Sequence, residues 1–371
     1  MLAMVPEYSN SPSSSAPVLR VGVIGATGWA KVSHLPALTR TQGLRLTAVS
    51  TTRPESARQV AAEWGVAHHF SSAADLARCA DVDLITISVK APEHRRLIEQ
   101  VAGAGKPVLC EWPLGTSASE TRYLADLLAA RGIPAFVGLQ ATAHPVLREV
   151  GRLVREGYIG NLLAATLTSS RARPNLMPAR NAYTLHTENG AGMVQILGGH
   201  SIAALATAAG QPLGTLSPTS GVVHLIQPLH VVEDGAQITA TSPDSATAAI
   251  PIGSIDAAVS LADGDIDPRT TVSLVGTKGR IDAITEPSEE LRRRQPQMAD
   301  WVATITTNEA RRKITTEPHD LPLTARNPAR LYEAIRSDLN IATATAPTTA
   351  DAISVHEIID SWLIDATPRR R

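Results

Sequence analysis

Aromatic residues are scarce in this sequence, at 3% of 371 residues, so its hydrophobic cores must be built from Ala, Val, Leu and Ile. Two cysteines, Cys79 and Cys110, are too few for a disulfide framework, and their neighbours predict that both lie in an apolar core. No apolar run approaches the roughly 18 residues that cross a bilayer. The first 17 residues also lack the basic start and apolar stretch of a secretion signal. We therefore expect a soluble cytoplasmic protein without a membrane partner.

The sequence also has no strong excess of charge of either sign, because the formal net charge is -1. Direct binding of nucleic acid or of a membrane surface needs a concentrated positive field, so we expect neither partner. Apolar residues make up 43% of the chain, enough to fill the cores of two domains. The Ser- and Pro-rich residues 1–17 are predicted to be a disordered leader, and residues 367–371 a solvated basic tail.

The N-terminal half alternates between short β-branched apolar runs and helix-like stretches. Strands are predicted at residues 19–25, 44–50, 82–88, 107–110 and 134–139. Helices are predicted at residues 29–38, 54–64, 92–101 and 117–131. Such alternation is typical of βαβ units. It predicts an α/β fold in which residues 18–140 form a dinucleotide-binding Rossmann domain with a doubly wound parallel sheet.

Beyond residue 140 the alternation stops. Helices are predicted at residues 145–156, 193–208, 327–340 and 349–363, with strands at 162–169 and through much of 214–284. Helices combined with an unbroken series of strands indicate an α+β domain with a large, mostly antiparallel open sheet. We assign residues 141–366 to this substrate and oligomerisation domain.

A glycine-containing turn joins the first predicted strand to the first predicted helix. In the dinucleotide fingerprint one glycine makes the tight turn, a second admits the pyrophosphate, and a small residue packs helix against strand. Gly25 fits the first position and Ala30 the third, whereas Thr27 occupies the second and Gly28 follows it. Thr27 either donates its hydroxyl to a phosphate or crowds the site. The helix start, with Trp29, would face the phosphates through free N–H groups.

The end of the second strand carries Thr51, Thr52 and Arg53, where many such domains place an acidic residue for the adenosine ribose. Hydroxyls and a guanidinium bind a phosphate, and no carboxylate repels it. These residues predict that NADP binds at least as well as NAD; the alternative is a polar loop with a chance arginine.

Several motifs now resemble the Gfo/Idh/MocA oxidoreductase family over nearly the whole chain after the leader. They are the first strand at residues 21–25, residues 34–38, 105–108, 111–114, 157–160 and 276–279. The resemblance implies a Rossmann domain followed by a sheet-bearing domain that often makes oligomer contacts, so a homo-oligomer is expected. It also implies an NAD or NADP cofactor and a sugar, polyol or related small molecule held between the domains.

Two departures from the family pattern matter for function. Trp112 follows Glu111 where family dehydrogenases carry a lysine, and an indole cannot shuttle a proton. His200 matches the family's histidine, but Ile196 stands where an aspartate is usual. These changes resemble the subgroup of the fungal galactose-pathway repressor and its bacterial relatives.

The resemblance supplies the remaining candidate residues. Glu111 and Trp112 are candidate cofactor contacts; Trp112 either stacks on the nicotinamide or a sugar, or packs in the core behind the cofactor. His200 and Lys90 are the candidate catalytic residues. Lys90 is a candidate through its position just past the third predicted strand, where it could substitute for the missing lysine, although a surface lysine is the better explanation.

His144, Arg171 and Arg173 fall where the family places substrate contacts. His68, His69, His224 and His230 lack metal-ligand spacing and companion carboxylates, so no metal is predicted.

Two functions of different classes fit the sequence. The first is an NAD(P)-dependent oxidoreductase acting on a sugar, polyol or similar small carbonyl or alcohol compound without the family's usual lysine. The second is a dinucleotide-binding sensor or regulator without significant turnover, with a small molecule as effector. No basic helix-turn-helix supports a directly DNA-binding regulator.

Overall fold

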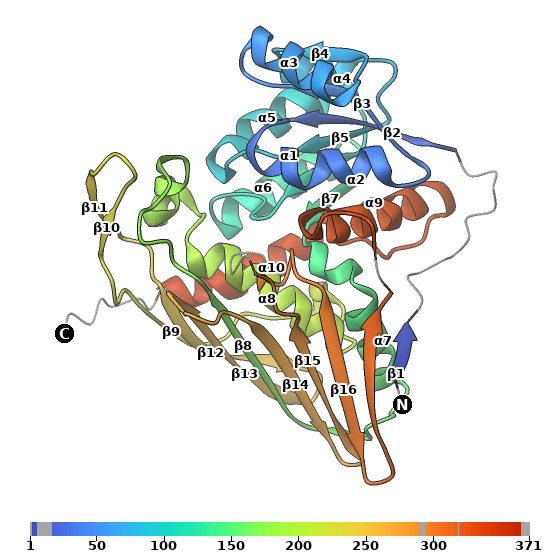
Figure 1. The fold of residues 1–371 in the computed structure, drawn as a ribbon, viewed down its shortest axis with the longest axis vertical. Coiled ribbons are helices and arrows are strands. Elements are labelled where there is room, and N and C mark those ends of the chain that lie inside the picture. The colour runs from blue at the N-terminus through green and yellow to red at the C-terminus, as the bar shows by residue number, and fades with distance from the viewer. Residues whose placement is uncertain (1, 6–16, 290–293, 318, 365–371) are drawn as a thin grey trace.

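The computed structural model describes residues 2–5, 17–289, 294–317 and 319–364. Figure 1 shows two sheets, a smaller one built from the first part of the chain (blue to green) and a large open one, with helices between them. Within these residues no helix has the length and apolar character needed to cross a membrane.

The N-terminal sheet has six strands, all of them parallel, in the order β4-β3-β2-β5-β6-β7. The strands are β2 (Leu19–Ile24), β3 (Leu44–Ser50), β4 (His68–Phe70), β5 (Leu84–Ile87), β6 (Val108–Glu111) and β7 (Ala135–Gly138). Most of their residues are buried, as expected for a sheet covered on both faces. The predicted doubly wound parallel sheet is therefore confirmed.

The helices of this part begin at residues whose chemistry favours a helix start. Pro54 opens α3, and the hydroxyls of Ser72 and Ser117 accept hydrogen bonds from the first turns of α4 and α6. The helices are α1 (Gly28–Val32), α2 (His34–Arg40), α3 (Pro54–Trp64), α4 (Ala73–Arg78), α5 (His94–Val101) and α6 (Ala118–Ala129). The helix predicted at residues 29–38 is in fact two helices, because the backbone leaves the helical region at Ser33.

The second sheet has nine strands in the order β1-β17-β16-β15-β14-β8-β13-β12-β9. The strands are β1 (Leu2–Val5), β8 (Leu162–Arg171), β9 (Gly221–His224), β12 (Ser245–Ile252), β13 (Ile255–Asp263), β14 (Thr270–Gly276), β15 (Gly279–Thr285), β16 (Trp301–Thr307) and β17 (Arg311–Thr316). Only the pairs β1–β17 and β8–β13 are parallel. The predicted large, mostly antiparallel sheet is confirmed. A separate hairpin joins β10 (Leu229–Val231) to β11 (Gln237–Thr239).

Three helices cover one face of the large sheet: α7 (Pro145–Arg155), α8 (Met193–Ala208) and α10 (Thr349–Ile364). Helix α8 is buried almost all round, because it contacts the sheet on one side and the chain after β7 on the other. Helix α10 packs against both α8 and α6 and so connects the two halves. One continuous hydrophobic core includes residues of both sheets, such as Ile85 and Leu261, and of helix α8, such as Ile202.

Two segments depart from the predicted division of the chain. Helix α9 (Leu323–Ile341) leaves the second domain and packs on the Rossmann domain, where Leu331 and Ile335 join the core formed by Val21 and Leu38. Leu2–Val5, predicted to belong to a disordered leader, instead pairs with β17. The rest of that leader, residues 6–16, and the basic tail, residues 367–371, lie outside the described residues.

Candidate functional site

The glycine turn between β2 and α1 has the conformation that close approach of a phosphate requires. Gly25 has a φ of 80°, and a Cβ there would lie 2.3 Å from the carbonyl oxygen of Ser88. Gly28 has a φ of 51°, yet a Cβ built on it would meet no atom within 4 Å. The space in front of Gly28, at the start of α1, is therefore open to a ligand.

Side chains around this turn fit the roles predicted for them. Ala30 is fully buried and packs the helix against the sheet. Thr27 is exposed and its hydroxyl makes no capping hydrogen bond to α1, so the hydroxyl is available to a phosphate. The indole nitrogen of Trp29 is buried without a partner among the described residues. The residues present fit a dinucleotide pyrophosphate.

Thr51, Thr52 and Arg53 lie at the carboxyl end of β3, next to the turn. The Thr51 hydroxyl donates to the carbonyl oxygen of Arg53 at 2.9 Å and fixes the bend that leads into α3. Arg53 and Thr52 are exposed, and the Arg53 guanidinium makes no ion pair with the described part of the chain. The geometry leaves this guanidinium free to bind an anion.

Glu111, at the end of β6, is the centre of a buried polar network. Gln140 donates an amide hydrogen to the Glu111 carboxylate at 2.8 Å, and His34 Nε2 lies 2.9 Å from it. An ionised carboxylate only accepts, so His34 donates through Nε2 and its Nδ1 accepts from the Tyr332 hydroxyl at 2.8 Å. Tyr332 in turn lies 2.9 Å from the Thr86 hydroxyl. The network ties α2, β5, β6 and α9 together.

The same network keeps Glu111 ionised despite its burial. Burial acts to raise the pKa of Glu111, but the hydrogen bonds from His34 and from the amide of Gln140 act in the opposite direction, and the pKa is lowered. His34 and Tyr332 were not recognised as site residues from the sequence. They lie 298 positions apart, and no local pattern links them.

Trp112 packs as a core residue behind this edge of the sheet. It is 5% exposed, and its indole N–H donates to the carbonyl oxygen of Gln195 in α8 at 2.9 Å. The ring occupies the space left by Gly199, where a Cβ would lie 2.2 Å from it. Its centroid is 5.2 Å from that of the His356 ring. These contacts favour the core interpretation over stacking on a nicotinamide.

His200 presents an unsatisfied polar atom from α8. Its side chain is buried, and Nδ1 has no hydrogen-bond partner among the described residues. Burial lowers the pKa of His200 to about 4, although the charge of Glu111 acts in the opposite direction. The imidazole is therefore neutral near pH 7, and a ligand hydroxyl or carbonyl would satisfy its free nitrogen.

Other buried polar atoms without partners surround the same region. Ser88 follows β5 and Gln140 follows β7, so both lie at the carboxyl edge of the parallel sheet. Gln195 belongs to α8, and Ser242 contacts the start of that helix at Gly192. Buried polar atoms normally have partners. Their concentration at this edge is consistent with a site for a polar ligand.

Lys90 lies just after β5 at the same edge. It is exposed, and its ammonium group lies 4.7 Å from the centroid of the Tyr183 ring in residues 179–185. Burial raises the pKa of Tyr183. Tyr183 was not predicted from the sequence, since its position beside Lys90 depends on the long segment before α8.

The three predicted substrate contacts all have partners within the protein. His144 is fully buried, begins α7, and places its ring nitrogens 3.2 Å from the backbone nitrogens of Val146 and Trp301. Arg171 forms an ion pair with Asp263 at 2.9 Å. Arg173 pairs with Asp244 and Asp263 at 3.1 Å each. These contacts favour structural roles for the three residues.

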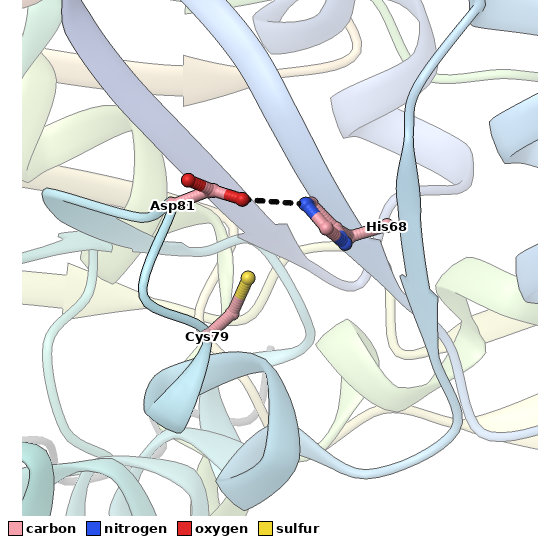
Figure 2. Close-up of side chains that lie close together, drawn as sticks. All are labelled: His68, Cys79 and Asp81. Carbon is pink, nitrogen blue, oxygen red and sulfur yellow. Dashed lines mark hydrogen bonds and ion pairs between the residues drawn. The ribbon is translucent and has the colours of Figure 1, made fainter.

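Two further features lie away from this edge. A cavity of 560 Å³ lies between α7, the end of α8 and residues 344–351, and it shares no residue with the predicted site. His68, Cys79 and Asp81 come together beside β4 (Figure 2), and Cys79 is partly buried and packs against the apolar core. The sequence argument that His68 lacks a companion carboxylate was therefore wrong, because Asp81 lies 2.9 Å from its ring.

Comparison with known proteins confirms the family resemblance at the Rossmann domain. Residues 19–139 match the model of the Gfo/Idh/MocA oxidoreductase family with an NAD-binding Rossmann fold. Dehydrogenase aclE of Aspergillus oryzae is 30% identical over 202 residues, covering 52% of this chain and 55% of the relative. Inositol 2-dehydrogenase of Rhizobium meliloti is 30% identical over 151 residues, covering 41% and 45%. The chain thus aligns with about half the length of these relatives.

Solved structures resemble the chain over nearly its full length. A super-repressor mutant of Gal80p from Saccharomyces cerevisiae has a TM-score of 0.79 at 20% identity, covering 94% of this chain and 95% of that one. KijD10, a 3-ketoreductase from Actinomadura kijaniata in complex with NADP and TDP-benzene, has a TM-score of 0.72 at 19% identity, covering 95% and 98%. At such identities the likeness establishes the two-part fold.

Proposed function

Because the Rossmann domain of this chain matches the Gfo/Idh/MocA oxidoreductase family, we propose that the protein is an NAD(P)-dependent oxidoreductase. Its substrate is a sugar, a polyol or a similar small carbonyl or alcohol compound. The observation that carries the proposal is the open glycine turn together with unpartnered polar atoms at the carboxyl edge of the sheet. Open α/β sheets bind ligands at this edge.

The chain's own residues supply the binding site for the dinucleotide. Gly25, Thr27, Gly28 and Ala30 would hold the pyrophosphate at the start of α1, and Arg53 the 2′-phosphate of NADP. Hydride transfer is the chemistry that a bound nicotinamide supplies. An uncharged 2′-hydroxyl would gain little from Arg53, so NADP is the preferred cofactor.

His200 is the acid–base group in this proposal. Its neutral imidazole accepts the proton of a substrate hydroxyl during oxidation, and the charge of Glu111 favours the imidazolium that results. Trp112 occupies the position of the family's lysine and cannot carry a proton. Losing one positioned acid–base group costs on the order of 10²–10⁴-fold in rate, so turnover is slow.

The charge of the site supports an uncharged substrate. Arg171 and Arg173, two of the three predicted substrate contacts, are neutralised by Asp263 and Asp244. Neither arginine is therefore free to hold a carboxylate or phosphate of a substrate. Hydroxyl groups match the unpartnered oxygens and nitrogens of Ser242, Gln195 and His200.

The test is a substrate screen on purified protein. NAD⁺ and NADP⁺ are offered with a panel of sugars and polyols, and formation of reduced nicotinamide is followed by absorbance. The expected result is slow, protein-dependent reduction of NADP⁺ by at least one neutral polyhydroxy compound.

A dinucleotide-binding sensor is the second candidate, favoured by Trp112 in place of the lysine and by the fold shared with Gal80p. Tight binding of the dinucleotide without reduction by any compound, in either direction, would support this candidate and contradict the oxidoreductase. A complete failure to bind either dinucleotide would contradict both.

A further inference from the structure

His68, Cys79 and Asp81 form a group of potential metal ligands outside the dinucleotide site. His68 begins β4, Cys79 follows the last residue of α4, and Asp81 lies in the turn before β5. One ligand atom of each residue, an imidazole nitrogen, a sulfur and a carboxylate oxygen, lies within 4.8 Å of the other two. Figure 2 shows the three side chains directed toward one another.

We propose that this group binds a zinc ion. Magnesium and calcium require oxygen ligands, which only Asp81 provides. A thiolate, an imidazole and a carboxylate are all ligands of zinc, and three protein ligands with one water complete its tetrahedral shell. The thiolate and the carboxylate balance the double charge of the ion.

The spacing of the three side chains suits such a site. Zinc bonds of about 2.0–2.3 Å place tetrahedral ligands roughly 3.3–3.7 Å apart. The His68 nitrogen and the Asp81 oxygen are 2.9 Å apart, joined by a hydrogen bond that the ion would replace. His68 is 37% exposed and Asp81 53%, so both side chains are free to adjust.

A second layer of contacts orients the ligands. Arg20 donates to the other Asp81 oxygen, Oδ1, at 3.1 Å, which leaves Oδ2 directed at His68. Arg20 is itself held by Asp83 at 2.7 Å. Lys106 donates to the backbone carbonyl of Cys79 and so holds the turn that carries the thiol. Such outer contacts are typical of protein metal sites.

The site would tie an edge strand to a turn. β4 is the last strand of its sheet and pairs only with β3, through three residues. A zinc ion would link its first residue to the turn between α4 and β5. Because that turn precedes β5, it lies at the amino end of the parallel strands. The dinucleotide turn lies at the opposite, carboxyl end, so metal binding and dinucleotide binding are separable.

Cobalt(II) titration of untagged, chelator-treated protein tests the proposal directly. A thiolate bound to cobalt gives a charge-transfer band in the near ultraviolet, and zinc should then displace the cobalt. We expect one equivalent of cobalt to produce this band. The variant C79S should abolish the band, and H68A and D81N should each weaken cobalt binding by about 100-fold or more.

His69 supplies the matched control, because it is the next residue of β4 and is exposed. H69A should bind cobalt as the unchanged protein does, and every variant should retain its dinucleotide affinity as proof of folding. Absence of the band at one equivalent would overturn the proposal. A band that persists unchanged in both H68A and D81N would also overturn it, since the thiol alone would then hold the metal.

Discussion

Three buried histidines make the stability of this protein sensitive to acid. Burial lowers the pKa of His144, His200 and His356 to about 4, and for His144 the charge of Arg330 adds to this effect. An unfolded histidine has a pKa near ~6.5. Between these values the unfolded chain binds more protons than the folded one, so stability falls as the pH drops from about 6.5 to about 4.

The variant H356Q tests this dependence at one residue. His356 Nδ1 lies 2.8 Å from the Thr121 hydroxyl, a contact that glutamine can replace. Below pH 6.5 each such histidine steepens the loss of unfolding free energy by at most about 1.4 kcal/mol per pH unit. H356Q should therefore have a shallower pH slope in urea unfolding between pH 6 and 4.5. The exposed control H69Q should keep the original slope, and an unchanged slope in H356Q would refute the assignment.

We propose that Arg53 determines the choice between NADP and NAD. R53A should lose about 1.5–3 kcal/mol of NADP affinity, roughly 10- to 150-fold, because a charge-assisted hydrogen bond to the 2′-phosphate is lost. NAD affinity should change little. The measurement is a fluorescence titration with both cofactors, and R58A, an exposed arginine in α3, is the control. Equal losses for NAD and NADP in R53A would count against a phosphate contact.

At the scale of single elements, the contact between α8 and the segment after β6 depends on Gly199. G199A places a methyl group 2.2 Å from the buried Trp112 ring. Overpacking of this kind costs about 1–3 kcal/mol, which exceeds the gain in helix propensity from alanine. Urea unfolding should show this loss, together with a shift in tryptophan fluorescence.

The control for G199A is a glycine with free space around it. A Cβ at Gly103 would meet no atom within 4 Å, and its φ is not positive. G103A should leave stability unchanged or raise it by up to about 1 kcal/mol. If G199A were as stable as G103A, Trp112 would not pack against α8 as described.

The sequence predicts well those helices and strands whose formation depends on residues adjacent in the chain. Five of the six parallel strands follow from short apolar runs bounded by turns, and Pro54 and Ser117 mark helix starts. The sixth strand, β4, was not predicted, because its three residues begin with two histidines and form no apolar run. The break at Ser33 was missed because the helical pattern continues through it. Strands β16 and β17 were also missed, since their polar, Thr- and Arg-rich residues alternate only weakly.

At the scale of the whole molecule, contacts distant in the sequence could not be predicted. Helix α9 returns to the Rossmann domain and brings Tyr332 to His34, although the two are 298 residues apart. Arg171 and Arg173 pair with Asp263 in β13 and with Asp244 just before β12. These partners are distant in the sequence, so no local pattern predicted the ion pairs. By contrast, the glycine turn and residues 51–53 were recognisable, because their geometry depends on adjacent residues.

We propose that His200 carries the proton in a dinucleotide-dependent reaction on a neutral polyhydroxy substrate. The most direct test is single-turnover reduction of NADP⁺ by unchanged protein and by H200A, with the best substrate from the screen, followed by nicotinamide absorbance. H69A is the control for loss of a histidine remote from the site.

H200A should reduce the rate on the order of 10²–10⁴-fold, because its acid–base group is gone. NADP affinity, measured in the same samples, should be unchanged, since His200 lies on α8 and not at the phosphate turn. H69A should react as the unchanged protein does. Full single-turnover activity in H200A would contradict this role for His200. Another group would then carry the proton, and Lys90 would be the first to examine.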